Sequence, residues 1–208
     1  MIDYVKVLSG MNENSREALL SRAERIVLNR ELDRLTEEIV ATRQALQLEN
    51  ADKQFLADRA KELGDRLKHI KNRQRELEHT TGEILLEKMI KSTKRMHNNR
   101  PKLPGVFSSL KDSSPLKTNG FGKMDPSELD VELAKETDCM KGCIESLKDA
   151  AQKLAKQEVQ LRAKYDIGDI SRSRFLTAHS EIRRNLAILK ISEEILDQLA
   201  CQAEDVLE

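Results

Sequence analysis

A 3.5-residue repeat of apolar side chains, from residue 28 to residue 84, constrains the fold of this chain more than any other feature. Alternate steps of four and three residues give 12 apolar positions out of 17 in one register. A repeat sustained over this length is typical of a coiled coil, because only supercoiled helices keep such a stripe facing a partner. We expect the following residues to form a partner-helix seam: Leu28, Leu32, Leu35, Ile39, Leu46, Leu56, Leu63, Leu67, Ile70, Leu77 and Ile84.

The sequence predicts one long helix over residues 14–97, after an N-terminal segment of residues 1–13. Residues 28–84 alone would span about 85 Å at roughly 1.5 Å per residue. Asn14, with Glu17 three residues later, gives a start signal for this helix. The run Thr80-Thr81-Gly82-Glu83 predicts a break near residues 80–83, with Thr80 as a new cap.

Polar residues occupy seam positions Thr42, Glu49, Lys53 and Gln74, besides Thr81 at the expected break. Polar residues at such positions weaken a coiled coil but often fix its register or its number of strands. The alternative is a locally loose seam that is open to solvent.

The composition of the 208 residues argues against an ordinary globule. Charged residues make up 35% of the chain and aromatic residues only 3%, with no Trp. Because aromatic side chains supply much of the buried area in thick cores, thin seams of Leu, Ile and Ala are expected instead. The fold class predicted is all-α, with elongated coiled-coil helices and a C-terminal antiparallel helical hairpin.

Residues 98–124 differ from the rest because they are rich in Pro, Gly and Ser and have no periodicity, so they predict a flexible linker. Residues 88–123 carry nine Lys or Arg against one Asp, although the whole chain has no net charge. The candidate basic patch consists of Lys88, Lys91, Lys94, Arg95, Arg100 and Lys102. It could attract microtubules or nucleic acid, or it could simply balance the acidic helices that follow.

Ser114 in this linker is a candidate phosphorylation site. The run Ser114-Pro115-Leu116-Lys117 resembles the site favoured by cyclin-dependent kinases. Phosphorylation would add about −1.5 to −2 charges and loosen an electrostatic contact with an acidic partner.

A helical hairpin is expected over residues 125–208. Asp125, Pro126 and Glu128 combine a cap, a first-turn proline and a capping-box glutamate, and they predict helices at about 126–166 and 171–207. Gly168 can end the first of these helices in the left-handed conformation. The hairpin packing residues expected are Leu129, Leu133, Leu147, Leu154, Leu161, Phe175, Ile182, Leu186, Leu189 and Leu196.

No phosphate loop, nucleophile elbow or helix-borne metalloprotease motif occurs in the sequence. Cys139 and Cys143 share a helical face, but a structural zinc site normally needs four ligands, and buried small hydrophobes are the simpler interpretation. We therefore expect no enzyme activity, no metal and no cofactor.

The location expected is intracellular, either the nucleus or the cytoplasm and its cytoskeleton. Three cysteines leave one unpaired in any disulfide framework. Neither a secretory leader nor an apolar run of spanning length is seen, so no membrane span is expected.

The turn formed by Tyr165, Gly168, Asp169, Ile170 and Phe175 resembles the hairpin turn in the Mod(r) subunits of the ESCRT-I sorting complex. The similarity covers little more than ten residues. It implies a membrane-trafficking adaptor in which the hairpin is the main assembly element.

The leading functional hypothesis is a nonenzymatic scaffold subunit of an elongated eukaryotic complex, at the kinetochore, on the spindle or on microtubules. Its partners would be other coiled-coil subunits, in a hetero-oligomer rather than a homodimer. The trafficking adaptor is the alternative hypothesis.

Overall fold

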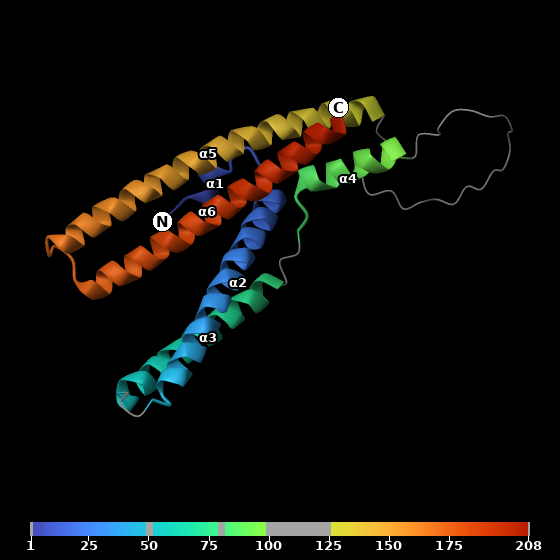
Figure 1. Cartoon of the computed structure of the whole chain (residues 1–208). Coiled ribbons are helices and arrows are strands. Elements are labelled where there is room, and N and C mark those ends of the chain that lie inside the picture. Colours follow the sequence, from blue (N-terminus) through green and yellow to red (C-terminus); the bar gives the residue numbers. More distant parts are fainter. Residues whose placement is uncertain (1, 49–51, 79–81, 99–125, 208) are drawn as a thin grey trace, which may run out of the picture.

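The computed structural model is all-helical in the part of the chain that it describes, residues 2–48, 52–78, 82–98 and 126–207 (Figure 1). The six helices are α1 (Tyr4–Val7), α2 (Glu13–Ala45), α3 (Lys53–Glu78), α4 (Leu85–Asn98), α5 (Pro126–Asp166) and α6 (Arg172–Leu207). Figure 1 shows two antiparallel helix pairs, α2 with α3 and α5 with α6, which diverge from a common region.

We call this common region the hub. It contains residues 126–154 of α5 and 188–207 of α6, packed against α1, α4 and the first half of α2. Its fully covered side chains include Leu19, Leu86, Leu133 and Leu196, each with no exposed surface. Burying a leucine side chain stabilises a fold by about 1.5–3 kcal/mol, so the hub is the main source of stability.

We call the second half of α2 together with α3 the α2–α3 arm. A separate cluster of five buried residues holds this pair together: Leu28, Leu35, Leu63, Ile70 and Leu77. Val27 packs in the hub, whereas Leu28 packs against α3. Helix α2 therefore belongs to both apolar clusters and connects them.

The prediction of one long helix over residues 14–97 is wrong. Helix α2 ends at Ala45 and α3 begins at Lys53, and the chain reverses between them, so one half of the seam packs on the other half. Polar residues occupy the seam at positions 42, 49 and 53, so a turn here costs little apolar burial. The structure places α3 of the same chain where a partner helix was expected.

Two of the expected helix starts differ from the structure. Asn12, not Asn14, caps α2, because its side chain accepts a hydrogen bond from the backbone N–H of Ser15 at 2.8 Å. Helix α4 begins after the expected break, which lies between Glu78 and Leu85. The Ser15 hydroxyl accepts a hydrogen bond from the N–H of Leu85 at 2.9 Å, so a side chain of α2 caps α4.

We call residues 155–187 the α5–α6 arm, since Leu154 and Ile188 are the last residues of the pair that are buried in the hub. The two helices span residues 126–166 and 172–207, compared with the expected 126–166 and 171–207. Gly168 ends α5 with φ +82°, a conformation that favours glycine. The N–H of Asp169 then donates to the carbonyl of Lys164 at 2.9 Å, and that of Gly168 to Tyr165 at 3.0 Å.

Candidate interaction surfaces

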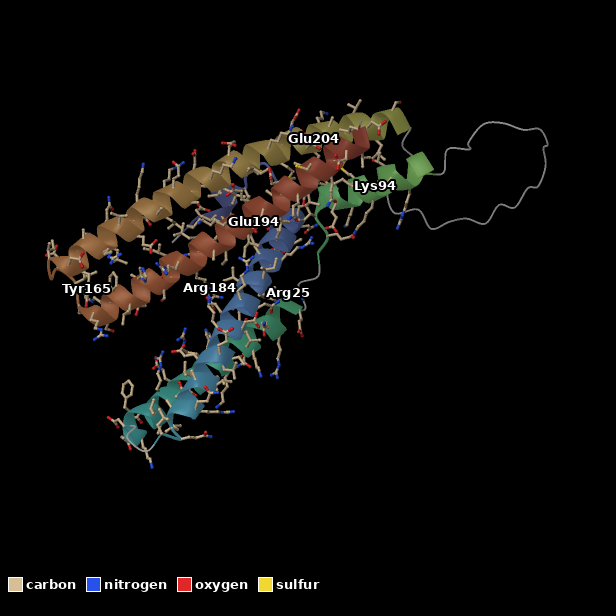
Figure 2. All side chains as sticks on the ribbon, in the orientation of Figure 1. Arg25, Lys94, Tyr165, Arg184, Glu194 and Glu204 are labelled. Carbon is tan, nitrogen blue, oxygen red and sulfur yellow. The ribbon has the colours of Figure 1, made fainter. Side chains whose placement is uncertain are left out.

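The carboxylate of Glu24 on α2 joins three helices. It accepts hydrogen bonds from Arg73 of α3, with Nε at 3.0 Å and a terminal guanidinium nitrogen at 2.9 Å. It also accepts one from Arg184 of α6 at 2.8 Å. The side chain of Glu24 is only 16% exposed. Figure 2 shows Arg184 on the part of α6 that faces α2. We call Glu24, Arg73 and Arg184 the arm junction.

Electrostatics favour the charged form of Glu24 at this junction. Burial disfavours the carboxylate, but the hydrogen bonds and positive charges of Arg73 and Arg184 outweigh that effect and lower the pKa of Glu24. The pKa of Arg73 is raised, chiefly by its hydrogen bonds with Glu24 and Glu76. The carboxylate of Glu24 and the guanidinium of Arg73 are therefore both held in their charged forms.

Tyr4 of α1 lies beside the arm junction. Its hydroxyl donates a hydrogen bond to the side-chain carbonyl of Asn185 at 3.2 Å. Burial, followed by the negative charge of Glu24, raises the pKa of Tyr4 to about 12. The neutral phenol thus ties the N-terminal segment to α6.

Two open clefts flank the arm junction. One, of about 650 Å³, has Tyr4, Leu20 and Ile188 in its wall, and the other, of about 550 Å³, lies between α3 and α6 beside His69. Both are lined by acidic and basic residues together, including Arg73 and Arg184. The carboxylate of Glu24 is already occupied by two guanidinium groups, which leaves it unsuited to act as a base.

The expected basic patch is only partly within the described residues. Lys88, Lys91, Lys94 and Arg95 are exposed on α4, and Figure 2 shows Lys94 pointing away from the hub. Lys91 forms ion pairs with Glu83 at 2.6 Å and with Glu87 at 3.1 Å. These acidic neighbours offset part of the charge that the sequence suggested.

Three expected site residues, Arg100, Lys102 and Ser114, lie outside the described residues, as do residues 99–124 of the linker expected over 98–124.

The expected seam residues are divided between two clusters. Besides the five buried residues of the α2–α3 arm, Leu32 and Ile39 pack on that cluster, while Leu46, Leu56 and Leu67 are half-buried. Ile84 instead lies in the hub with an exposed fraction of 1%. Gln74 donates to the side chain of Asn29 at 2.7 Å, so this polar seam position is paired within the chain.

The expected packing residues of α5 and α6 are buried to different extents. The six in the hub are buried: Leu129, Leu133, Leu147, Leu154, Leu189 and Leu196. The four in the α5–α6 arm are only half-buried: Leu161, Phe175, Ile182 and Leu186. A two-helix layer therefore leaves much of its own seam in contact with water.

Exposed apolar side chains gather toward the outer ends of both arms. In the α2–α3 arm, Leu48 is 63% exposed and Phe55 is 64% exposed. In the α5–α6 arm, Ile167 is 74% exposed and Leu176 is 53% exposed. Single exposed apolar residues are ordinary, and Val5, Val131 and Val159 are exposed elsewhere, but the two at each arm end give apolar surface that a partner could cover.

Cys139 and Cys143 lie together on α5 under the turn at Gly10. The thiol of Cys139 donates to the carbonyl of Gly10 at 3.0 Å, and burial raises the pKa of both thiols. Protonated thiols of this kind are poor nucleophiles and poor metal ligands. In the ranges that the structure describes, no group of three or more His, Cys, Asp or Glu residues is arranged to hold a metal ion.

Sequence reasoning missed the arm junction and the cap that Ser15 provides for α4. Arg73 lies 49 residues after Glu24, and Arg184 lies 111 residues after Arg73, so no local sequence pattern connects them. In a chain that is 35% charged, nothing distinguishes these three from the many exposed charged residues. The one available signal is that Leu20, Val27 and Leu28, at i−4, i+3 and i+4 from Glu24, are apolar.

Comparison of the chain with models of known protein families, with curated proteins and with solved structures finds no match. None of the described helices is long and apolar enough to cross a membrane.

Proposed function

We propose that this chain is a nonenzymatic scaffold subunit of an elongated helical complex. The observation that supports this most directly is that two two-helix arms diverge from one hub, each with exposed apolar side chains toward its outer end (Figure 1). A chain built in this way offers two separated docking points at a fixed angle. That is the task of a connector between other subunits.

The half-buried seam of the α5–α6 arm supports the same proposal. Phe175 and Ile182 lie at expected packing positions, yet only one helix covers each of them. Each square ångström of apolar surface that a partner helix removed from water would contribute about 25 cal/mol. Coiled-coil partners in a hetero-oligomer would supply that cover for the outer part of this arm, beyond the contacts that α1 and α2 make at Asn185 and Arg184.

Chromosome segregation or the microtubule cytoskeleton is the setting we propose for the complex, with a location in the nucleus or in the cytoplasm and its cytoskeleton. Support comes from the proline-directed site at Ser114 and from the basic residues of α4 beside it in the sequence. Together they form a basic segment that would attract an acidic polymer, and phosphorylation would weaken that attraction.

A trafficking adaptor of the ESCRT type is the second candidate. The rings of Tyr165 and Phe175 stack with centroids 4.4 Å apart, beside the left-handed Gly168. These are residues that resemble the Mod(r) turn, and their geometry gives a well-defined end to the α5–α6 pair. In this case the α5–α6 pair, not the α2–α3 arm, would be the main assembly element.

Isolation of the tagged full chain from cells, with stoichiometries measured by native mass spectrometry, tests the scaffold proposal. We expect helical partners at fixed stoichiometry, and at least tenfold less recovery when Leu48 and Phe55 are both changed to Asp. Val131→Asp is the matched control, because Val131 is also 63% exposed but lies in the hub. A chain that remains monomeric in cells, or equal loss with the control, would refute the proposal.

Partner identity distinguishes the two settings. Triple replacement of Lys91, Lys94 and Arg95 by Glu should weaken salt-sensitive binding to microtubules or DNA in the first setting. In the trafficking setting it should have little effect.

A further inference from the structure

The charge of the α5–α6 pair is divided along its length. In the hub, residues 126–154 and 188–207 carry five Lys or Arg against twelve Asp or Glu. The α5–α6 arm, residues 155–187, carries seven Lys or Arg against four Asp or Glu. Over residues 124–208 as a whole, the 12 Lys or Arg and 18 Asp or Glu hide this reversal, because the acidic part is longer and more strongly charged.

The acidic part of the pair has a basic neighbour in the same chain. Helix α4, with four basic residues and one acidic residue, packs on α5 and α6 in the hub. Among the described helices, the acidic neighbours of the basic arm are carboxylates of α2 and α3, which lie beside residues 177–185, including Glu24 at Arg184. The excess charge nearer the turn is therefore left to an external partner.

Ion pairs within the chain neutralise only the inner half of the arm. Glu158 pairs with Arg183 at 3.1 Å and with His179 at 3.0 Å, and Arg184 pairs with Glu24 in the arm junction. Toward the turn, Arg162, Lys164, Arg172 and Arg174 are all exposed, against Asp166 and Asp169. In the described chain, no ion pair within 4.0 Å engages these four cations.

The turn itself is held in one conformation. The Tyr165 and Phe175 rings stack, and the Phe175 and His179 rings stack in turn at 5.2 Å. The hydroxyl of Ser171 accepts a hydrogen bond from the N–H of Arg174 at 3.4 Å at the start of α6. The aromatic rings thus pack against one another within the turn, while Ile167 and Leu176 remain exposed.

We propose that this turn end docks an acidic amphipathic helix of a partner protein. Leucine-type side chains of that helix would cover Ile167 and Leu176, and its carboxylates would meet the surrounding Arg and Lys side chains. The inference rests on the proposed scaffold function, for which it names the chemistry of one partner.

Other acidic partners fit this surface less well. Phosphates of nucleic acid gain nothing from Ile167 and Leu176, and Asp166 and Asp169 repel them. Insertion into an anionic membrane would place both aspartates at the lipid surface, which is unfavourable. A protein helix can direct its own basic or polar residues toward these aspartates.

Fluorescence anisotropy with a defined probe tests the proposal. The probe is a labelled, helical peptide of about 20 residues with Leu on one face and Glu on the other, added to the full chain. We expect binding that weakens at least tenfold when Arg162, Arg172 and Arg174 are changed to Glu, and several-fold for Ile167→Ser. Binding should also weaken as salt is raised from about 0.05 to 0.5 M.

Two controls match these variants. Replacement of Arg25, Arg30 and Arg34 by Glu reverses three exposed charges on α2, and Val131→Ser removes an exposed apolar side chain from the hub. Both should leave the affinity within twofold, and circular dichroism should show that every variant is folded.

The docking proposal is overturned if the peptide does not bind, if the controls weaken binding equally, or if phosphatidylserine vesicles or duplex DNA bind more tightly without dependence on Ile167. If the recovery of partners depends on Phe55 but the peptide does not bind, only the docking proposal is overturned. Loss of both would overturn the scaffold function as well.

Discussion

Replacement of Glu24 should separate the two arms more than any other single change on the surface of this chain. The structure has Arg73 of α3 and Arg184 of α6 bound to the same carboxylate, which is the only described residue that bonds to both helices. Glu24→Gln keeps the shape of the side chain but removes its charge. One guanidinium group would then face the amide N–H₂ and lose its acceptor.

The size of the effect follows from burial. Removing one partner of a fully buried ion pair costs about 3–5 kcal/mol, and an exposed pair contributes about 0–1 kcal/mol. Glu24 is 16% exposed, while Arg73 and Arg184 are 42% and 33% exposed, so the junction lies between these limits. We expect Glu24→Gln to lower the free energy of unfolding by about 2 kcal/mol.

Urea denaturation followed by circular dichroism measures this loss. Glu38→Gln is the matched control, because Glu38 also pairs with an arginine across two helices, Arg59, but is 42% exposed. Its expected cost is about 0.5 kcal/mol. A double-mutant cycle between Glu24 and Arg184 should give a coupling free energy of about 1 kcal/mol.

Small-angle X-ray scattering tests the geometric part of the prediction. Glu24→Gln should change the maximum dimension of the particle, because the angle between the arms is then held only by the remaining contacts of α2 with the hub, which are chiefly apolar. Equal stability of Glu24→Gln and Glu38→Gln, with an unchanged scattering curve, would refute the role of the junction.

The sign of the pH dependence is fixed by the lowered pKa of Glu24. A carboxylate whose folded pKa lies below its ordinary value of 4.5 contributes stability above that value and loses it as pH falls through the folded pKa. The difference in stability between wild type and Glu24→Gln should therefore be constant near neutral pH. It should shrink below about pH 4.5.

Two further predictions concern a pair of glycines, Gly82 and Gly64, and the phenol of Tyr4. Gly82→Ala should lower the free energy of unfolding by about 1–2 kcal/mol, because the added Cβ would lie 2.9 Å from the Cβ of Ala18. Gly64→Ala has open space around it and should raise the free energy of unfolding by up to about 1 kcal/mol. Thermal unfolding of both variants checks this pair. An ultraviolet titration should show one tyrosine that ionises near pH 12, and this signal should be lost in Tyr4→Phe. The folded pKa of Tyr4 is raised from 10.0 to about 12, so its contribution to stability is present below pH 10 and is lost as pH rises from 10 to 12.

The sequence predicts the helices of this fold better than it predicts how they pair. Pro126 and Gly168 are local signals, and α5 begins at the first and ends two residues before the second. The pairing of α2 with α3 was missed because a heptad seam is the same whether its partner is another chain or the same chain folded back. Leu28 and Leu63 would be buried in either arrangement, so burial patterns could not distinguish the two.

Long-range polar contacts are the part that the sequence could not supply. Ser15 caps a helix 70 residues away, and Glu24 binds an arginine 160 residues away. Neither contact has a spacing rule, since each depends on how α2 lies across α4 and α6. Charge counts fail in a similar way, because Arg172 and Glu194 belong to one helix but to oppositely charged parts of the molecule.

The arm junction and the docking surface on the α5–α6 arm are physically linked. Arg184 is one of the seven basic residues of that arm, and Glu24 neutralises it from the first half of α2. An acidic partner that approached the α5–α6 arm would compete with Glu24 for Arg184 if it extended past Glu158 toward the hub. A partner helix that stays on the outer side of Glu158 therefore leaves the arm angle unchanged. A longer acidic helix that reaches Arg184 should displace Glu24 and open the arms.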